Sequence, residues 1–238
     1  MAVKRLARSK LQNSCVSIDL KSVKAVIFDV DGTFYDLKRM YARVRLEVFR
    51  YYLFHPKDLQ EIQLVTTFIR ERESRVDQVV DDLESAQYEW AAIAAGVPPE
   101  KVRTAVKKWV DQVPLKYIYS YRHPEILQLF QCITNRGIAT GVFSDYPPQA
   151  KLAQLGLSPD CVVSAIDRNV RRLKPDPTGL LVAAEKLNVN VEQCLFIGDR
   201  DDRDGECARR AGMPYVILGQ DKQLSAIAKN LLNQFLSI

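Results

Sequence analysis

The amino-acid sequence predicts an α/β fold: a Rossmann-like parallel sheet of about five strands with helices on both faces, plus an inserted α-helical domain. From residue 124 onward, short apolar runs rich in β-branched residues alternate with helical patterns, which is typical of a parallel sheet buried on both faces. A similar apolar run at residues 23–28 stands apart from the others. In residues 36–113 apolar residues recur only at helical spacing. The predicted strands therefore flank a long helical block.

Taken in chain order, the first strand ends directly in Asp29, Asp31 and Gly32. Four helices are expected next, over residues 37–52, 59–69, 76–95 and 102–113. A block of this size is too large for a crossover between neighbouring strands, so it is expected to pack on itself. A helix from Pro124 to the residues before Gly137 follows. The remaining strands are expected at residues 138–144, 161–165, 193–198 and 215–218.

These elements divide the chain into three parts. Residues 1–22 form a basic N-terminal segment that is expected to be flexible, with a targeting leader as the alternative. Residues 23–35 and 123–238 form the α/β core domain, and residues 36–122 form the helical domain.

Composition limits the class of protein. The net charge of +5 comes from basic residues spread along the chain, so nucleic-acid binding is not expected. No apolar window approaches the length of a membrane span, and residues 1–15 lack the apolar core of a secretory signal, so a cytoplasmic protein is expected. The five cysteines contain no close pair and there are two histidines, which argues against a disulfide framework and a zinc site.

Polar side chains follow several of the predicted strands. Asp29 and Asp31 follow the first, Ser144 and Asp145 the second, and Asp199 and Asp204 the fourth, while Lys174 precedes the helix leading into the fourth. Ligands bind outside the carboxyl ends of the strands in open parallel sheets, so these groups are expected to share one pocket. Phosphoryl transfer needs an oxygen nucleophile, a hard cation, a positive side chain, hydrogen-bond donors and a proton donor, and this set supplies all of them. Asp29, Asp199 and Asp204 offer oxygen ligands that suit Mg²⁺.

The charges constrain the roles, because several carboxylates cannot share a small site in ionised form without cations between them. The two positive charges of Mg²⁺ and the one of Lys174 together offset the negative charges of three carboxylates. The fourth carboxyl group is expected to hold its proton near neutral pH, and Asp31, two residues from the nucleophile, is the natural general acid and later base.

With these motifs the chain resembles the haloacid dehalogenase superfamily in its phosphatase branch, and within it the phosphoglycolate phosphatase-like members. The signatures are DVDGT (29–33), VFSD with Ser144, LKPDP with Lys174, and GDRDDRD with Asp199 and Asp204. The resemblance covers nearly the whole chain after residue 22 and implies that the block between the first two signatures is a helical cap that closes over the site.

The resemblance also implies the role of each residue. Asp29 would attack phosphorus and form a phosphoaspartyl intermediate, and Asp31 would protonate the leaving group and then activate water. Ser144 and Lys174 would bind phosphate, with Thr33 and Asp145 also in the substrate site. Mg²⁺ would be held by Asp29, the Asp31 backbone carbonyl and Asp199, with support from Asp204.

Two features qualify this interpretation. Phe34 stands where the family usually has Leu, and Asp145 stands where Asn is common. An acid beside a phosphate is unfavourable.

The three arginines Arg70, Arg72 and Arg75 are candidates for holding a substrate, but they alternate with glutamates, which is the pattern of a solvated helix face.

The expected protein is thus a Mg²⁺-dependent phosphatase acting on a small phosphorylated metabolite such as a sugar phosphate, phosphoglycolate or a nucleotide, as a monomer or homodimer. Asp31 argues against dehalogenation, because members that cleave carbon–halogen bonds differ at that position. A phosphomutase shares every signature and stays open as an alternative, as does a catalytically weak binding or regulatory protein.

Overall fold

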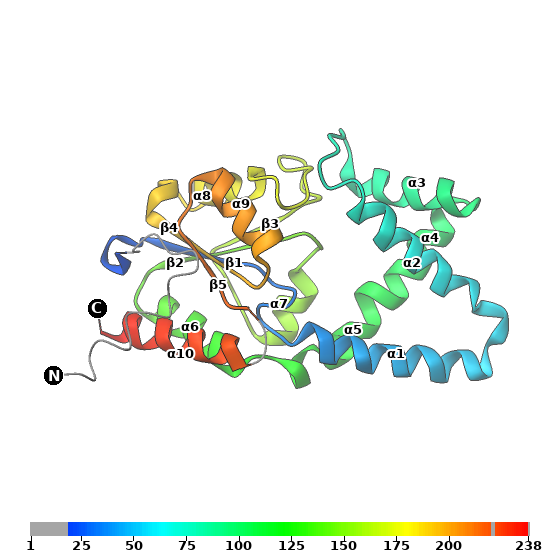
Figure 1. Cartoon of the computed structure of the whole chain (residues 1–238), viewed down its shortest axis with the longest axis horizontal. Helices are drawn as coiled ribbons and strands as arrows, with labels where there is room; N and C mark the ends of the chain where they lie inside the picture. The colour runs from blue at the N-terminus through cyan, green and yellow to red at the C-terminus, as the bar shows by residue number, and fades with distance from the viewer. Residues whose placement is uncertain (1–18, 220–221, 238) are drawn as a thin grey trace.

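The structure, a computed structural model, describes residues 19–219 and 222–237. Its centre is a parallel sheet of five strands in the order β3–β2–β1–β4–β5 (Figure 1). The strands are β1 (Ala25–Phe28), β2 (Ala139–Ser144), β3 (Cys161–Ser164), β4 (Cys194–Gly198) and β5 (Tyr215–Ile217). The predicted α/β fold and its five strands are confirmed. β1 pairs with both β2 and β4, so the carboxyl ends of these three strands are neighbours.

Helices cover both faces of the sheet. On one face lie α6 (Pro124–Asn135), α7 (Gln149–Leu155) and α10 (Lys222–Leu236), and on the other α8 (Thr178–Lys186) and α9 (Glu206–Ala211). Along β1, Val26 and Phe28 pack into the first layer, whereas Ala25 and Ile27 pack into the second. This alternation follows from the opposite directions of successive side chains in a strand, and it explains why β1 is apolar throughout.

Between β1 and α6 the chain forms a helical insertion, residues 37–121. It contains α1 (Leu37–Phe54), α2 (Gln60–Glu73), α3 (Leu83–Ala95), α4 (Pro99–Val106), a π-helical segment (Lys107–Gln112) and α5 (Val113–Ile118). Apolar clusters of its own hold it together: Phe68, Tyr88 and Val102 join α2, α3 and α4, while Val44 and Trp109 join α1 to the π-helical segment. Figure 1 shows the insertion beside the sheet rather than on either face of it. Shorter helical turns lie at Leu20–Ser22, Pro56–Asp58, Tyr119–Tyr121, Val191–Gln193 and, with π geometry, Asp201–Gly205.

The insertion differs from the sequence-based prediction in two places. The helix expected from residue 76 begins only at Leu83, because the Asp82 side chain accepts a hydrogen bond from the Ser85 N–H at 3.2 Å and caps the helix there. The helix expected to end at residue 113 continues to Ile118 through the π-helical segment. The π-helical segment ends two residues before Pro114, which has no N–H to donate to a regular helix.

The two connections between the insertion and the sheet run next to each other. The Asp36 N–H donates to the Tyr121 carbonyl, and the His123 N–H donates to the Phe34 carbonyl, both at 2.8 Å. These hydrogen bonds lie just beyond the carboxyl end of β1, so the insertion enters and leaves the sheet region beside the predicted site.

One expectation falls outside the structure. Most of the basic N-terminal segment, with Cys15, lies outside the described residues. Among the described helices, none combines the length and the apolar character that a bilayer crossing requires.

Candidate functional site

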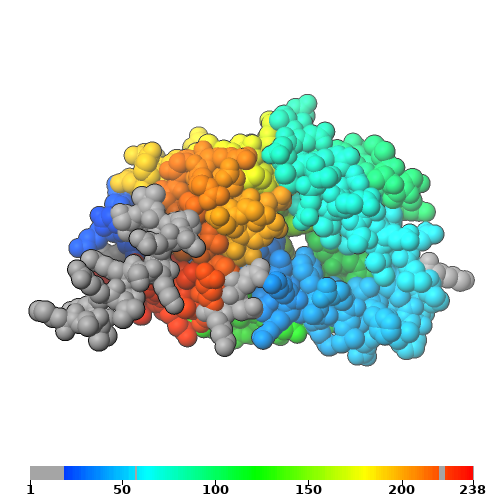
Figure 2. Space-filling view, viewed as in Figure 1, coloured from blue at the N-terminus to red at the C-terminus, as the bar shows by residue number. Residues whose placement is uncertain are grey.

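The predicted site residues come together at the carboxyl ends of the central strands. Six of them line one cavity of about 220 Å³, called here the inner cavity: Asp29, Asp31, Asp145, Lys174, Asp199 and Asp204. The other two, Thr33 and Ser144, are completely buried next to Asp29 and Asp145, respectively. Residues from α1 and α2 complete the walls. Figure 2 shows an opening in this region between α1, α2 and the segment that follows β4.

Lys174 is the positive centre of the inner cavity. Its ammonium donates to one oxygen of Asp29 and, at 2.7 Å, to Asp204. All three side chains are buried, so the ammonium and the carboxylates interact with little screening by water. Burial works against the charged ammonium, but the charges of Asp204 and Asp29 outweigh it and raise the pKa of Lys174 well above its usual value. The amine is therefore protonated at neutral pH.

Three carboxylates form a candidate cation site. One oxygen each of Asp29, Asp199 and Asp204 lies within 4.8 Å of the others. Burial, together with the charge of Asp204, raises the pKa of Asp199 to about 7. Burial also raises the pKa of Asp29 well above its usual value, although Lys174 acts in the opposite direction. Three crowded carboxylates, two of which have raised pKa values, fit a hard divalent cation such as Mg²⁺.

The charge state of Asp31 differs from the prediction. Lys151, in the first turn of α7, donates to both Asp31 oxygens at 2.6 Å, and the Tyr35 hydroxyl donates to one of them. Burial acts to raise the pKa of Asp31, but the charge and hydrogen bonds of Lys151 outweigh it and leave the pKa below its usual value. The expectation that Asp31 keeps its proton is therefore wrong for this arrangement. The sequence argument missed Lys151 because it belongs to no motif and lies 120 residues from Asp31.

The backbone after β1 allows the carboxylates to approach each other. Gly32 has a φ of +95°, which side-chain-bearing residues rarely adopt, and a Cβ there would collide with the carboxylate of Asp199. The Thr33 hydroxyl donates to Oδ2 of Asp29 at 3.1 Å. Thr33 thus fixes the Asp29 carboxylate.

Asp145 is held by protein donors on both oxygens. Oδ1 accepts a hydrogen bond from the Lys174 N–H at 2.9 Å, and Oδ2 lies 3.4 Å from the Arg203 guanidinium. The negative charge of Asp145 is thereby offset by Arg203, and its side chain anchors the loop that carries Lys174. Ser144 ends β2, and its hydroxyl accepts a hydrogen bond from the Tyr146 N–H at 3.3 Å.

Arg72 of α2 enters the inner cavity from the helical insertion. Its side chain is 2% exposed, donates to Gln87 at 3.0 Å and to the Asp145 carbonyl, and lies over the Tyr146 ring with 4.0 Å between Cζ and the ring centroid. Among the described residues it makes no ion pair with a carboxylate. The prediction of a solvated helix face holds for Arg70 but is wrong for Arg72, because Leu64, Phe68 and Arg72 share the buried face of α2.

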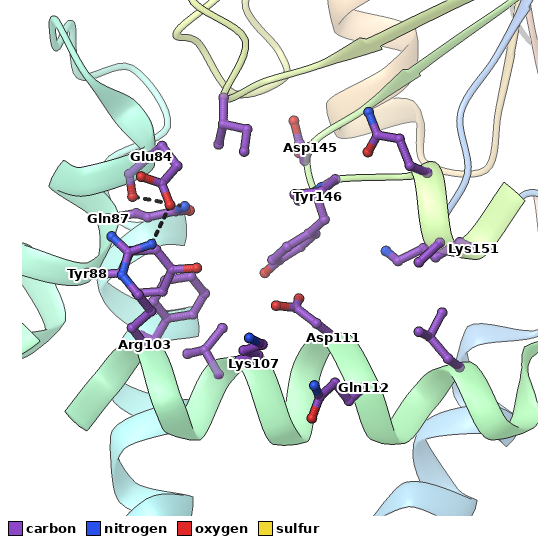
Figure 3. A pocket seen from close by; sticks show the side chains of 17 residues that line it. Glu84, Gln87, Tyr88, Arg103, Lys107, Asp111, Gln112, Asp145, Tyr146 and Lys151 are labelled. Carbon is purple, nitrogen blue, oxygen red and sulfur yellow. Dashed lines mark hydrogen bonds and ion pairs between the residues drawn. The ribbon is translucent and has the colours of Figure 1, made fainter. Parts of the chain in front are cut away.

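A second, larger cavity of about 530 Å³, called here the outer cavity, adjoins the inner one (Figure 3). It lies between α3, α4 and the π-helical segment on one side and the loop from Asp145 to Lys151 on the other. Asp145 and Tyr146 line both cavities. Lys151, which contacts Asp31, also lines the outer cavity.

A family model described as haloacid dehalogenase-like hydrolase matches residues 23–212. The chain belongs to this family of hydrolases. The match includes all four predicted signatures and most of the described sheet.

Curated relatives of this hydrolase carry phosphatase names. A phosphoglycolate phosphatase from Xanthomonas campestris is 36% identical over 115 residues, which is 44% of this chain and 52% of the relative, so the match spans about half of that protein. Fructose-1-phosphate phosphatase YqaB from Escherichia coli is 30% identical over 80% of this chain and 94% of its own. The crystal structure of a HAD phosphatase from Thermococcus onnurineus superposes with a TM-score of 0.60 at 20% identity, over 84% of this chain and 88% of that one, which confirms the fold.

Proposed function

We propose that this hydrolase is a Mg²⁺-dependent phosphomonoesterase that acts on a small phosphorylated metabolite through a phosphoaspartyl intermediate on Asp29. The observation that carries the proposal is the meeting of a buried carboxylate, a buried ammonium and two further carboxylates in one cavity at the strand ends. Relatives named as phosphatases of phosphoglycolate and fructose 1-phosphate support the same class of reaction.

Asp29 is the proposed nucleophile. One of its oxygens would form a bond to phosphorus as the bond between phosphorus and the leaving oxygen breaks, and water would later release inorganic phosphate and restore the carboxylate. Thr33 and Lys174 hold its two oxygens, so the attacking group is oriented before substrate enters. Lys174, with Ser144 at the end of β2, would bind the phosphoryl oxygens.

Asp29, Asp199 and Asp204 would hold Mg²⁺, together with the backbone carbonyl of Asp31. When bound, the ion would neutralise negative charge on the carboxylates and on the phosphoryl group. Lys174 contacts two of these carboxylates, so it already offsets part of their charge.

Asp31 is the proposed acid that protonates the leaving oxygen and the base that then activates water. Lys151 contacts both Asp31 oxygens in this structure and keeps the pKa of Asp31 low, so Lys151 must move aside and Asp31 must take up a proton from water before it can act as the acid. We propose that the helical insertion acts as the cap over this site. Arg72 supports that role, because it links α2 to the Asp145 carbonyl of the sheet region.

The test is phosphate release from a panel of phosphorylated metabolites and a generic aryl phosphate, with Mg²⁺ or with a chelator. We expect hydrolysis with Mg²⁺, loss with the chelator and recovery when Mg²⁺ returns. Isomerisation of a sugar phosphate without phosphate release would favour the phosphomutase alternative. No reaction with any substrate, together with a co-purifying protein, would favour a binding role.

Stability should report Mg²⁺ binding independently of activity. The raised pKa of Asp199, about 7, means that the folded protein without metal binds more protons than the unfolded chain between about pH 4 and pH 7. Its stability should therefore fall as pH rises through that range. Mg²⁺ binds the ionised carboxylates, so its stabilising effect should grow over the same range.

We use one Mg²⁺ concentration, about 100 times the Kd at pH 8, at both pH values. It should raise Tm by roughly 5–10 °C at pH 8 and by clearly less at pH 5, where binding is weaker. Thermal unfolding with Mg²⁺ or a chelator at both pH values measures this. Asp202→Asn is the matched control, because this exposed side chain bonds to Arg200, and it should keep the full shift. Equal shifts at both pH values would contradict the assignment of these carboxylates as ligands.

A further inference from the structure

The outer cavity has no role in binding phosphate, yet it opens beside the proposed proton donor. Lys151, which bonds to Asp31, lines it, as do Asp145 and Tyr146, which also line the inner cavity. A phosphomonoester with its phosphate at Asp29 would thus have this space available for the group attached through the leaving oxygen. A volume of about 530 Å³ is in the range of pockets that enclose a whole small molecule, and a two-carbon leaving group would fill little of it.

One carboxylate in this cavity has no partner among the described residues. Of the three acidic residues in its wall, Glu84 pairs with Arg103 and Asp145 with Arg203, whereas Asp111 makes no hydrogen bond or ion pair with any described residue. Figure 3 shows Asp111 rising from its helix toward the cavity, below Tyr146. Burial raises the pKa of Asp111, although the charges of Lys151 and Lys107 act against this. A partly buried carboxylate without a donor lacks hydrogen bonds that a ligand could provide.

The cavity wall also holds uncharged polar groups, among them two tyrosines and a glutamine. The hydroxyl groups of Tyr88 and Tyr146 make no hydrogen bond to any described residue, and both rings lie in the cavity wall (Figure 3). Gln87 lies beside them, and its amide oxygen accepts from Arg72. Hydroxyl groups and a carboxylate are complementary to a ligand that carries several hydroxyl groups of its own.

The cavity offers little to an anionic leaving group. Arg103 is paired with Glu84, and Lys151 is paired with Asp31 as long as no leaving group displaces it. Lys107, whose side chain is exposed, is the remaining cation in the wall, and it faces the unpaired Asp111. A carboxylate on the leaving group would have to approach the negative charge of Asp111, which an uncharged group would not have to do.

We propose that the outer cavity binds the leaving group of the substrate and selects an uncharged polyol, such as a hexose, with Asp111 accepting hydrogen bonds from two of its hydroxyl groups. This inference rests on the proposed phosphatase function and adds the class of substrate. Tyr88 and Tyr146 supply further hydroxyl contacts, so sugar phosphates are preferred over short anionic phosphoesters.

The experiment compares kcat/KM for glucose 6-phosphate, phosphoglycolate and a generic aryl phosphate in the wild-type protein and in Asp111→Asn. We expect the wild type to prefer glucose 6-phosphate over phosphoglycolate. In Asp111→Asn the ratio of kcat/KM for glucose 6-phosphate to that for the aryl phosphate should fall about 10-fold to 100-fold, mainly through KM, because hydrogen bonds to a charged group are lost. The preference over phosphoglycolate should shrink as well, since a negative charge is removed.

Glu100→Gln is the matched control, because this exposed carboxylate lies on α4 outside the cavity wall, and it should leave the ratio unchanged. Tyr88→Phe is a second variant that keeps the ring packed on Phe68 and removes one hydroxyl group, and it should lower the ratio about 3-fold to 10-fold. Thermal unfolding of each variant checks that the fold is retained.

The outcomes separate the two proposals. Hydrolysis of the aryl phosphate with no preference for the sugar phosphate, or with a ratio that neither variant changes, overturns the polyol site and leaves the phosphatase proposal standing. A wild-type preference for phosphoglycolate also overturns it. Absence of hydrolysis with every substrate overturns both.

Discussion

Asp29→Asn should abolish phosphomonoester hydrolysis and leave the protein folded. The amide has nearly the shape of the carboxylate but cannot attack phosphorus, so kcat/KM for an aryl phosphate should fall by about 10⁴-fold or more. Stability should not fall with it. Burial and the charges of Asp204 and Asp199 disfavour the ionised carboxylate, and Lys174 keeps its second partner in Asp204. Phosphate release and thermal unfolding, measured on the same preparation, test both parts of the prediction.

The matched control is again Asp202→Asn, in the same motif as the site carboxylates but exposed and paired with Arg200. Its activity should stay within about twofold of wild type, because exposed pairs of this kind contribute little. Retained turnover in Asp29→Asn would remove Asp29 as nucleophile. Loss of folding in that variant would show that the carboxylate is needed for the structure instead.

The meeting of the strand ends could be predicted from sequence because the geometry of a parallel sheet imposes it. Apolar runs locate the strands, and their carboxyl ends lie on one edge, so Asp29, Asp145 and Asp199 had to converge once β1, β2 and β4 were neighbours. Lys174 does not follow a strand. It lies in the loop before α8, and its ammonium reaches Asp29 at the same edge of the sheet.

The residues that the sequence argument missed come from segments whose position depends on tertiary packing. The sequence marks Lys151 only as a lysine in a helical turn. The packing of α7 on the same face of the sheet as α6 and α10 brings it to Asp31, and this contact reverses the expected charge state. The sequence does contain a pattern that predicts the burial of Arg72. This residue follows Leu64 and Phe68 at intervals of four residues, and that spacing places it on the apolar face of α2 despite its glutamate neighbours.

Lys174→Met should have the second large effect, and it should act on stability as well as on activity. The side chains of Lys174, Asp29 and Asp204 are 3%, 4% and 2% exposed, respectively, so removing the ammonium leaves two buried carboxylates without their shared partner. Breaking a buried ion pair on one side typically costs about 3–5 kcal/mol, a large part of the roughly 5–15 kcal/mol that stabilises a domain. Phosphate hydrolysis should fall below detection.

The pH dependence shows whether lost charge pairing or lost packing causes the defect. Without Lys174 the Asp29 carboxyl group loses the interaction that lowers its pKa, so its folded-state pKa rises further above that of the unfolded chain. The destabilisation should therefore be largest above about pH 7 and shrink toward pH 5, where this carboxyl group holds its proton more easily. Urea unfolding at pH 8 and pH 5 measures the difference, with Lys186→Met, an exposed lysine of α8, as the control.

A double variant completes the test. Lys174→Met combined with Asp204→Asn removes one of the two orphaned charges, so it should recover part of the free energy of unfolding at pH 8 while remaining inactive. Mg²⁺ should stabilise the single variant for the same reason, because the ion replaces positive charge next to the carboxylates. A loss that is equal at both pH values and unchanged in the double variant would mean that Lys174 contributes through packing alone. In that case the site would not be organised around its charge, and the roles proposed for Asp29 and Asp204 would have to be reassigned.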